Sequence, residues 1–86
     1  DAAFSAILEK FLLGLMEKNL QHYGITDLCT VLLPKIGSRL SLLPLERLRL
    51  ESSAYGIRVQ AEKAAAALRE RLGLLPKAVY LFVKPV

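Results

Sequence analysis

The sequence predicts a small α+β domain, in which two N-terminal helices are followed by a β-hairpin, an Ala-rich helix and a C-terminal strand. Residues 60–72 contain only strong helix formers, whereas residues 78–83 are apolar, β-branched or aromatic, as in a strand. Residues 47–54 alternate between charged or polar and apolar or small side chains, which is the period of a strand with one wet face. The expected order is therefore α-α-β-β-α-β, with the helices packed on one face of a small sheet.

The first expected helix covers Ala2–Tyr23 and ends at Gly24. Its apolar positions recur three and four residues apart, so they form one broad arc of the helix surface. The arc consists of Phe4, Ile7, Leu8, Phe11, Leu12, Leu15, Met16, Leu20 and Tyr23. The opposite side carries acidic and basic residues together rather than an excess of Lys and Arg, which argues against a membrane-surface helix. We therefore expect no membrane binding, and we expect this helix to pack in a core or in a dimer.

A second helix is expected after a cap at Thr26 or Asp27, with its apolar side chains mostly buried. Pro34 cannot donate a backbone hydrogen bond, and its ring clashes with the carbonyl four residues earlier. The helix therefore either kinks at Pro34 or ends there, with Pro34 opening a short helix over residues 35–40. Residues 42–44 are expected to connect this part of the chain to the next.

Residues 45–59 fit two interpretations. The alternation described above favours a hairpin, with a turn at 52–56 and a returning strand at 57–59. The alternative is a helix, whose inner face would contain Leu45, Leu48, Ser52, Tyr55 and Val59. We favour the hairpin because the two serines and the glycine of the turn are poor residues for the middle of a helix.

The Ala-rich helix and the final strand complete the expected fold. The apolar residues of the helix share one face, which contains Ala61, Ala64, Ala65, Leu68 and Leu72. Gly73 suits the position just after a helix, and two arginines in the last turn suit the negative end of the helix dipole. The strand at 78–83 has apolar residues on both faces, so we expect it to lie inside a sheet or to meet another chain.

Length and composition favour one domain with an interface. The chain has 86 residues, and 53% of them are hydrophobic. A chain of this length buries only about 60–65% of the surface that its unfolded form exposes. Some apolar side chains are therefore expected to contact a second copy or a protein partner. Because the chain begins with Asp rather than Met, we expect a processed product or a part of a longer protein.

Reactive residues are few. Cys29 is the one cysteine, which excludes an internal disulfide and favours a reducing cytoplasmic location. Cys29 and His22 together are too few for a structural zinc site, which needs about four such ligands. The sequence contains no glycine-rich phosphate loop, no segment of about 18 uncharged apolar residues and no signal peptide. We therefore expect neither enzyme activity nor a metal or cofactor.

The expected function is that of a non-catalytic protein-interaction or oligomerisation module. The unusually apolar composition favours a homodimer, formed through the N-terminal helix and the C-terminal strand. The interface residues that we expect are Phe4, Leu8, Phe11, Leu15, Tyr80 and Phe82.

The charge distribution suggests nucleic-acid binding as an alternative function. Residues 1–34 carry two basic and four acidic side chains, a net charge of −2, whereas residues 35–86 carry ten basic and four acidic side chains, a net charge of +6. If the basic side chains converge, they bind the phosphates of a nucleic-acid backbone. The phosphate-binding residues would be Arg47, Arg49, Arg58 and Lys63, beside Tyr55 as a platform for a base.

Overall fold

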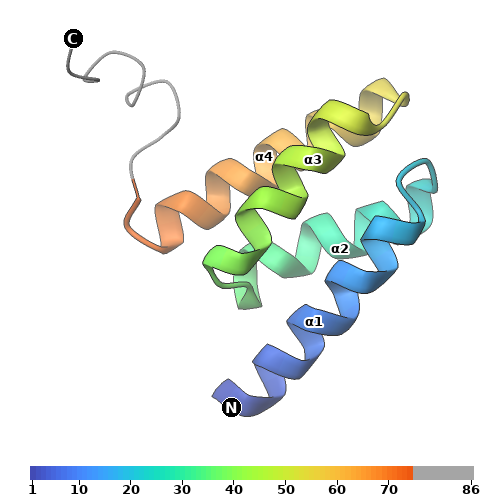
Figure 1. Ribbon diagram of the computed structural model, residues 1–86. Coiled ribbons are helices and arrows are strands. Elements are labelled where there is room, and N and C mark those ends of the chain that lie inside the picture. The colour runs from blue at the N-terminus through green and yellow to red at the C-terminus, as the bar shows by residue number, and fades with distance from the viewer. Residues whose placement is uncertain (75–86) are drawn as a thin grey trace, which may run out of the picture.

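The computed structural model of the protein describes residues 1–74 and contains only helices in that range (Figure 1). The α-helices are α1 (Ala2–Lys18), α2 (Tyr23–Ile36), α3 (Leu42–Glu51) and α4 (Tyr55–Arg71), and the 3-10 helix η1 (Arg39–Ser41) leads directly into α3. The predicted α+β fold is therefore wrong, because the described residues form no strand and no sheet. The strand predicted at 78–83 lies outside the described residues.

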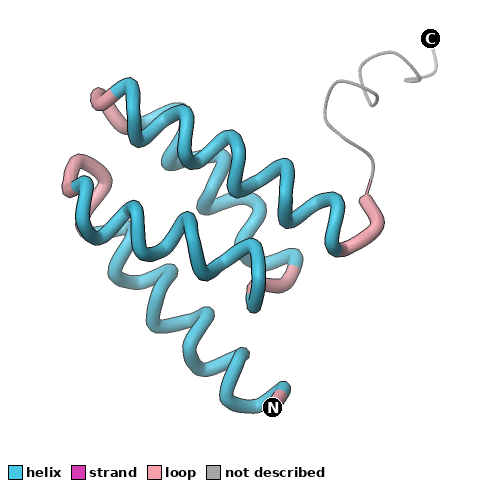
Figure 2. Tube along the Cα trace, turned by 180° about the vertical axis from the view of Figure 1, so that it is seen from behind, coloured by secondary structure: helices cyan, strands magenta, loops and turns pink. Residues whose placement is uncertain are grey.

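Helices that are neighbours in sequence run antiparallel, so α2 and α4 point the same way (Figures 1 and 2). The most extensive packing joins α4 to α3 and α4 to α2, whereas α1 packs mainly on α2 and only lightly on α3. The N-terminal turns of α1 extend beyond the other helices (Figure 1). The result is a four-helix fold in which α4 packs against both α2 and α3, and α1 lies mainly against α2.

The core is formed by one face of each helix. Its buried apolar side chains are Leu12 and Met16 from α1, Cys29 and Leu33 from α2, Leu45 and Leu48 from α3, and Ile57, Ala61, Ala64, Ala65 and Leu68 from α4. The predicted apolar face of the Ala-rich helix is confirmed, although α4 begins five residues earlier than predicted, at Tyr55. The small alanine side chains let α4 approach both α2 and α3 closely, which is why α4 lies at the centre of the packing.

The predicted hairpin at 45–59 is wrong, and two helices take its place. Leu45 and Leu48 are fully buried on one side of α3, at helical spacing. Along the helix surface, Glu46 accepts from Arg49 and Glu51 accepts from Arg47, which are pairs three and four residues apart. The serines that suggested a turn do break the chain, but the break separates α3 from α4 rather than two strands. The helical alternative was correct for Leu45 and Leu48, but not as one inner face over 45–59, because the chain breaks between α3 and α4 and Tyr55 is exposed.

The boundaries of the first two helices also differ from the prediction. α1 ends at Lys18 rather than Tyr23, because the Asn19 side chain donates to the carbonyl of Leu15 (2.8 Å) and the chain then turns. The N-cap of α2 is His22, whose Nδ1 accepts from the amide of Ile25 (3.2 Å), instead of Thr26 or Asp27. Consequently Gly24, which was expected to end the first helix, lies in the first turn of the second.

Both prolines among residues 1–74 lie inside helices, but only Pro44 lies in a first turn, where proline is readily tolerated. Pro34 occupies the last turn of α2, which continues to Ile36 and does not restart as a second short helix. Pro44 occupies the first turn of α3, where backbone amides have no partner within the helix. The connector predicted at 42–44 is therefore the beginning of α3.

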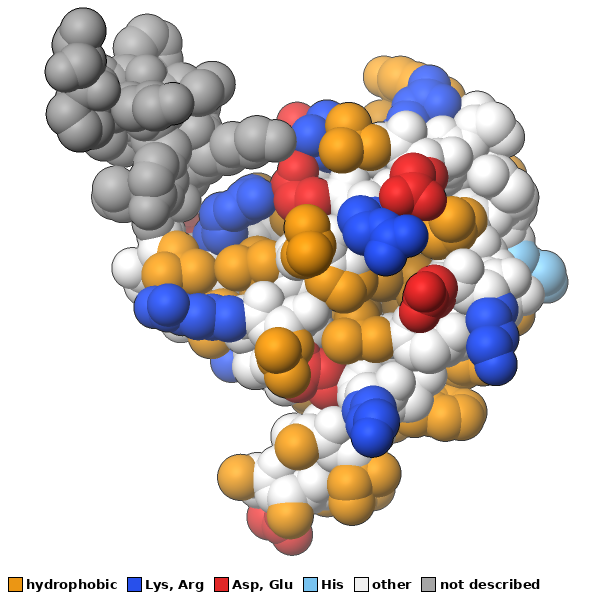
Figure 3. Space-filling view, in the orientation of Figure 1, with side chains coloured by type: hydrophobic (Ala, Val, Ile, Leu, Met, Phe, Trp, Pro, Cys, Tyr) orange, Lys and Arg blue, Asp and Glu red, His pale blue; other side chains and the backbone are white. Residues whose placement is uncertain are grey.

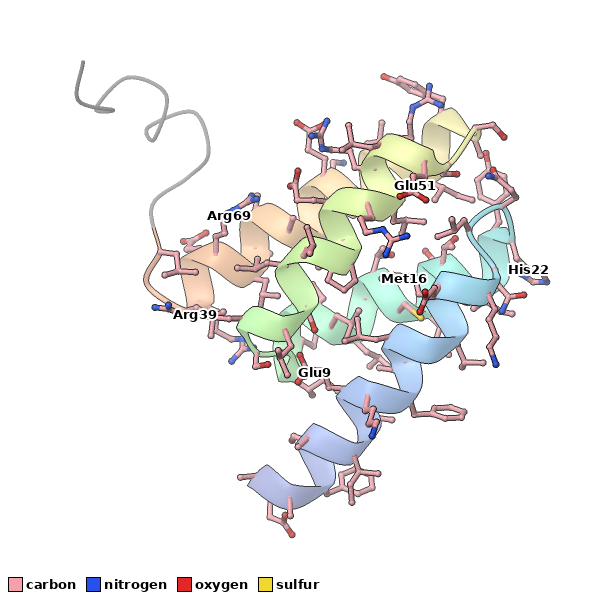
Figure 4. The ribbon with its side chains drawn as sticks, viewed as in Figure 1. Glu9, Met16, His22, Arg39, Glu51 and Arg69 are labelled. Atoms are coloured by element: carbon pink, nitrogen blue, oxygen red, sulfur yellow. The ribbon has the colours of Figure 1, made fainter. Side chains whose placement is uncertain are left out.

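Three polar side chains form hydrogen bonds with loop residues that are distant in the sequence. Glu9 of α1 is buried and accepts from the amide of Ser38 (2.7 Å) and from the hydroxyls of Ser38 and Ser41 (Figure 4). Two further side chains act in the same way. Gln21 accepts from the amide of Ser53 (2.9 Å) and from two serine hydroxyls, and Arg71 donates to the carbonyls of Pro34 (2.7 Å) and Gly37.

Gly37 permits the close turn between α2 and η1. An added Cβ at this position would lie 2.6 Å from the carbonyl oxygen of Leu33 and 2.8 Å from Ser41 Oγ. We therefore expect Gly37→Ala to lower the free energy of unfolding by about 2 kcal/mol, because the backbone must shift to accept the methyl group. Urea unfolding monitored by circular dichroism measures this change. An unchanged midpoint and slope would contradict this description of the turn.

Candidate functional site

The outer face of α1 carries the largest unburied apolar side chains of that helix. Phe4, Ile7 and Phe11 are 62%, 69% and 61% exposed, although each is a large hydrophobic residue. With Gly14 and Lys18 they follow the spacing of three and four residues that places side chains in one line along a helix. We call these five residues the α1 seam. Large apolar side chains lined up in water are typical of an interaction surface.

The expected interface residues divide into three groups. Phe4 and Phe11 belong to the α1 seam and are exposed. Leu8 and Leu15 are half-buried beside the seam, and Leu8 packs against the core. The other two, Tyr80 and Phe82, lie outside the described residues. Ile7 was on the predicted apolar arc but not among the predicted interface residues. Its spacing of three and four residues from Phe4 and Phe11 could have identified it as one.

The α1 seam contains a hollow next to its second phenylalanine. The hollow has a volume of about 220 Å³ and is lined by Lys10, Phe11, Gly14, Leu15 and Lys18. It exists because Gly14 has no side chain: an added Cβ there meets nothing within 4 Å. A protruding ring and an unfilled space therefore lie side by side on one helix face.

A second hollow lies where α1 passes α3. Its apolar walls are Leu13, Met16, Leu20 and Pro44, and its rim carries Glu17, Arg47 and Glu51. Its volume is about 70 Å³, well below the ~300–1,000 Å³ of small-molecule pockets. It is too small for a cofactor or a metabolite.

A second group of exposed apolar side chains lies on η1 and α3. Leu40, Leu43 and Leu50 are 75%, 69% and 67% exposed. Apolar side chains are visible across the face that α1 and α3 share in Figure 3, but charged groups interrupt them. Arg47 stands between Leu43 and Leu50 and pairs with Glu51 (3.0 Å). This group is therefore less continuous than the α1 seam.

The basic residues proposed for nucleic acid do not form one stripe. Arg47 and Arg49 would share a strand face, but on helix α3 they point about 200° apart. Arg58 donates to the carbonyl of Ser52 (3.1 Å) and lies 5.7 Å from the ring centre of Tyr55, and Lys63 is exposed on α4. Figure 3 likewise shows Lys and Arg dispersed over that face of the molecule.

Most of the arginines in the described residues are occupied within the fold. Glu46 of α3 accepts from Arg49 of the same helix (3.0 Å) and from Arg69 of α4 (2.9 Å), in a partly buried cluster. Arg47 pairs with Glu51, and Arg71 donates to two carbonyls at the end of α2. Arg69 and Arg71 connect different elements and Arg47 and Arg49 pair within α3, so a phosphate would have to compete with these internal partners.

The described residues contain no arrangement of reactive groups. Cys29 is fully buried, its thiol donates to the carbonyl of Leu12 (3.4 Å), and burial raises the pKa of the thiol, which keeps it in the unreactive neutral form. His22 caps α2. No group of three or more metal-ligating side chains occurs among residues 1–74.

Comparison with known proteins adds no further constraint. No protein-family model, no curated protein and no solved structure matches the chain. None of the helices within residues 1–74 combines the length and the hydrophobicity that crossing a membrane requires.

Proposed function

We propose that this protein is a non-catalytic self-association module that forms a homodimer through the α1 seam. The observation that carries this proposal is the line of three large apolar side chains, Phe4, Ile7 and Phe11, each more than 60% exposed. These three side chains do not contribute to the core, because α1 packs on it through Leu12 and Met16, on the other side of the helix. A second copy of the chain would bury these three side chains and remove them from water.

The energetic argument is one of area. Burying a large apolar side chain fully contributes about 1.5–3 kcal/mol, so the three side chains of the α1 seam together supply several kcal/mol. A pair of α1 helices forms an interface at the small end of the range for specific complexes. The proposed dimer is therefore expected to exchange with monomer in dilute solution.

The proposal predicts that Phe11→Asp abolishes self-association without unfolding the protein. A charge at this position would be desolvated in the dimer, whereas in the monomer it stays in water. Sedimentation equilibrium between about 1 μM and 500 μM, a range suited to a small interface, measures the mass. Circular dichroism of the same samples checks the fold.

Leu50→Asp is the matched control, because Leu50 is a similarly exposed apolar residue on α3. We expect this variant to associate like the unmodified chain. The proposal fails if the unmodified chain is monomeric over the whole range. It also fails if Leu50→Asp, rather than Phe11→Asp, removes the dimer.

Nucleic-acid binding is the second candidate, and one observation favours it. Arg58 lies over the ring of Tyr55, whose side chain is 73% exposed, so the start of α4 offers an aromatic platform with a cation beside it. The internal pairing of Arg47 and Arg49 makes this candidate weaker than self-association. Sedimentation repeated with single-stranded RNA at low salt separates the two. A cytoplasmic location, inferred from the single cysteine, remains part of the proposal.

A further inference from the structure

We infer that the two copies pair their α1 helices antiparallel, with Phe11 of each copy seated over Gly14 of the other. This inference rests on the proposed function, because it specifies how the α1 seam meets its own copy. Three features of α1 lead to it: a protruding ring, an unfilled hollow beside that ring, and opposite charges that one arrangement brings together.

The ring and the hollow have matching sizes. The hollow at Gly14 has a volume of about 220 Å³, and a cavity of about 150 Å³ already holds a benzene ring. The ring of Phe11 stands at its edge and is 61% exposed. A two-fold interface brings the same patch of both copies together. The ring of each copy therefore fills the hollow of the other copy.

The folded monomer has no visible need for glycine at position 14. Glycine is among the poorest helix formers, yet Gly14 lies in the middle of α1. Its backbone is ordinary, since Gly73 is the one residue with positive φ among those described. A Cβ at Gly14 would meet no atom within 4 Å, so alanine fits the monomer equally well. What the glycine supplies is the hollow.

Seating Phe11 over Gly14 fixes the register of the pair. Residues whose numbers sum to about 25 then face each other, so Ile7 of one copy meets Lys18 of the other. The apolar stem of a lysine covers such a side chain while its ammonium group stays in water. On the core side of the seam, Leu8 faces Leu15 of the second copy, and both are already half-buried. The seam is thus covered from Ile7 to Lys18, whereas Phe4 lies beyond the end of α1 of the other copy.

Charges on the other flank of the seam complement each other in this register. Lys10 and Glu17 are seven residues apart, so they lie on the same side of α1, and both are exposed. Antiparallel pairing places Lys10 of each copy near Glu17 of the other, which gives two opposite-charge contacts related by the two-fold axis. A parallel pair would set Gly14 against Gly14, leave both hollows unfilled and place Lys10 across from Leu15.

Two complementary charge variants test the arrangement. In Lys10→Glu the introduced carboxylate faces Glu17 of the other copy, and in Glu17→Lys the introduced ammonium faces Lys10. Each variant alone is therefore expected to raise the dimer dissociation constant about ten-fold, from the loss of two attractive contacts and the gain of two repulsive ones. An equimolar mixture forms a mixed dimer with both contacts attractive, so we expect it to regain the original affinity.

Crosslinking reports the direction of the helices independently. A chain with Ile7→Cys and a chain with Lys18→Cys should form a disulfide with each other, whereas Phe4→Cys chains should not crosslink among themselves. Cys29 is buried and stays out of this reaction. Gly14→Ala should weaken the dimer while leaving the monomer at least as resistant to unfolding, since only the hollow is lost.

The outcomes separate the two proposals. A mixture that regains affinity, together with the crosslink between positions 7 and 18, supports the antiparallel pair. A dimer that is sensitive to Phe11→Asp but crosslinks through position 4, or is indifferent to mixing, overturns the antiparallel pair and leaves the proposed dimer standing. A monomeric unmodified chain overturns both.

Discussion

Replacing Glu9 with alanine is expected to lower the free energy of unfolding by about 3 kcal/mol, a large share of the total stability of a domain this size. Glu9 is 5% exposed, and its carboxylate accepts from the amide of Ser38 and from the hydroxyls of Ser38 and Ser41. Hydrogen bonds to a charged group contribute more than neutral ones, and a donor left buried without a partner adds its own desolvation cost.

Urea unfolding of dilute protein measures the change, and the dilution keeps self-association out of the result. Glu17→Ala is the control, because Glu17 is an exposed acid on the same helix, and we expect it to change stability by less than about 0.5 kcal/mol. Glu9→Gln should fall between the two, since it keeps one acceptor oxygen but sets an amide donor against other donors. Equal stability of all three variants would contradict the role given to Glu9.

Leu48→Ala is expected to cost about 3 kcal/mol, whereas Leu50→Ala should cost less than about 0.5 kcal/mol. Leu48 is completely buried in the core and Leu50 is 67% exposed. The pair therefore distinguishes the two interpretations of residues 45–59. In a hairpin both leucines would point to the same face and both truncations would be costly, but on a helix they lie about 200° apart.

The measurement is again urea unfolding. The slope of the transition checks that each variant exposes as much surface on unfolding as the unmodified chain does. Similar losses for both leucines would contradict helix α3. A loss for Leu48 alone would contradict the hairpin. Far-ultraviolet circular dichroism of the unmodified chain gives a third, independent test through its helix content.

The helix prediction was correct where the apolar residues fitted only a helical period. It was wrong where the same residues fitted both a helical period and a strand period. Ala61, Ala64, Ala65 and Leu68 of α4 could form only one helical face, and that face is buried. Between Leu45 and Glu51, by contrast, leucines at positions 48 and 50 imitate a strand, whereas leucines at 45 and 48 fit a helix. The charge pairs Glu46–Arg49 and Arg47–Glu51 could have decided the matter, because their spacing of three and four residues is useful only on a helix.

The helix ends were less predictable because the capping residues were atypical. A histidine caps α2, and α4 begins after Ala54, whose side chain makes no capping bond. The usual rules search for Ser, Thr, Asp or Asn and therefore chose Thr26 or Asp27. Thr26 instead donates to the carbonyl of His22 (2.8 Å), inside the first turn of the helix.

The candidate surface was predicted in part. Phe4 and Phe11 were chosen from the apolar arc of α1, and both are exposed. The arc was too wide to show which side of α1 would face the core. The side that does so is determined by the packing of α2 and α3 against Leu12 and Met16. The nucleic-acid interpretation relied on the hairpin for the joint placement of Arg47 and Arg49, and the helix separates them.

The projecting start of α1 is held by few tertiary contacts. Among residues 1–7 only Ser5 is even partly buried, so tertiary contacts do little to hold this segment helical. Helix ends with few contacts open at little free-energy cost, and their amide hydrogens exchange quickly with solvent. Asp1 satisfies a first-turn amide by accepting from Phe4 (2.9 Å), and three alanines lose no side-chain entropy when the segment is helical. If two copies pair through the α1 seam as proposed, we expect hydrogen exchange in these turns to become slower as protein concentration rises, because pairing adds contacts to a segment that has few.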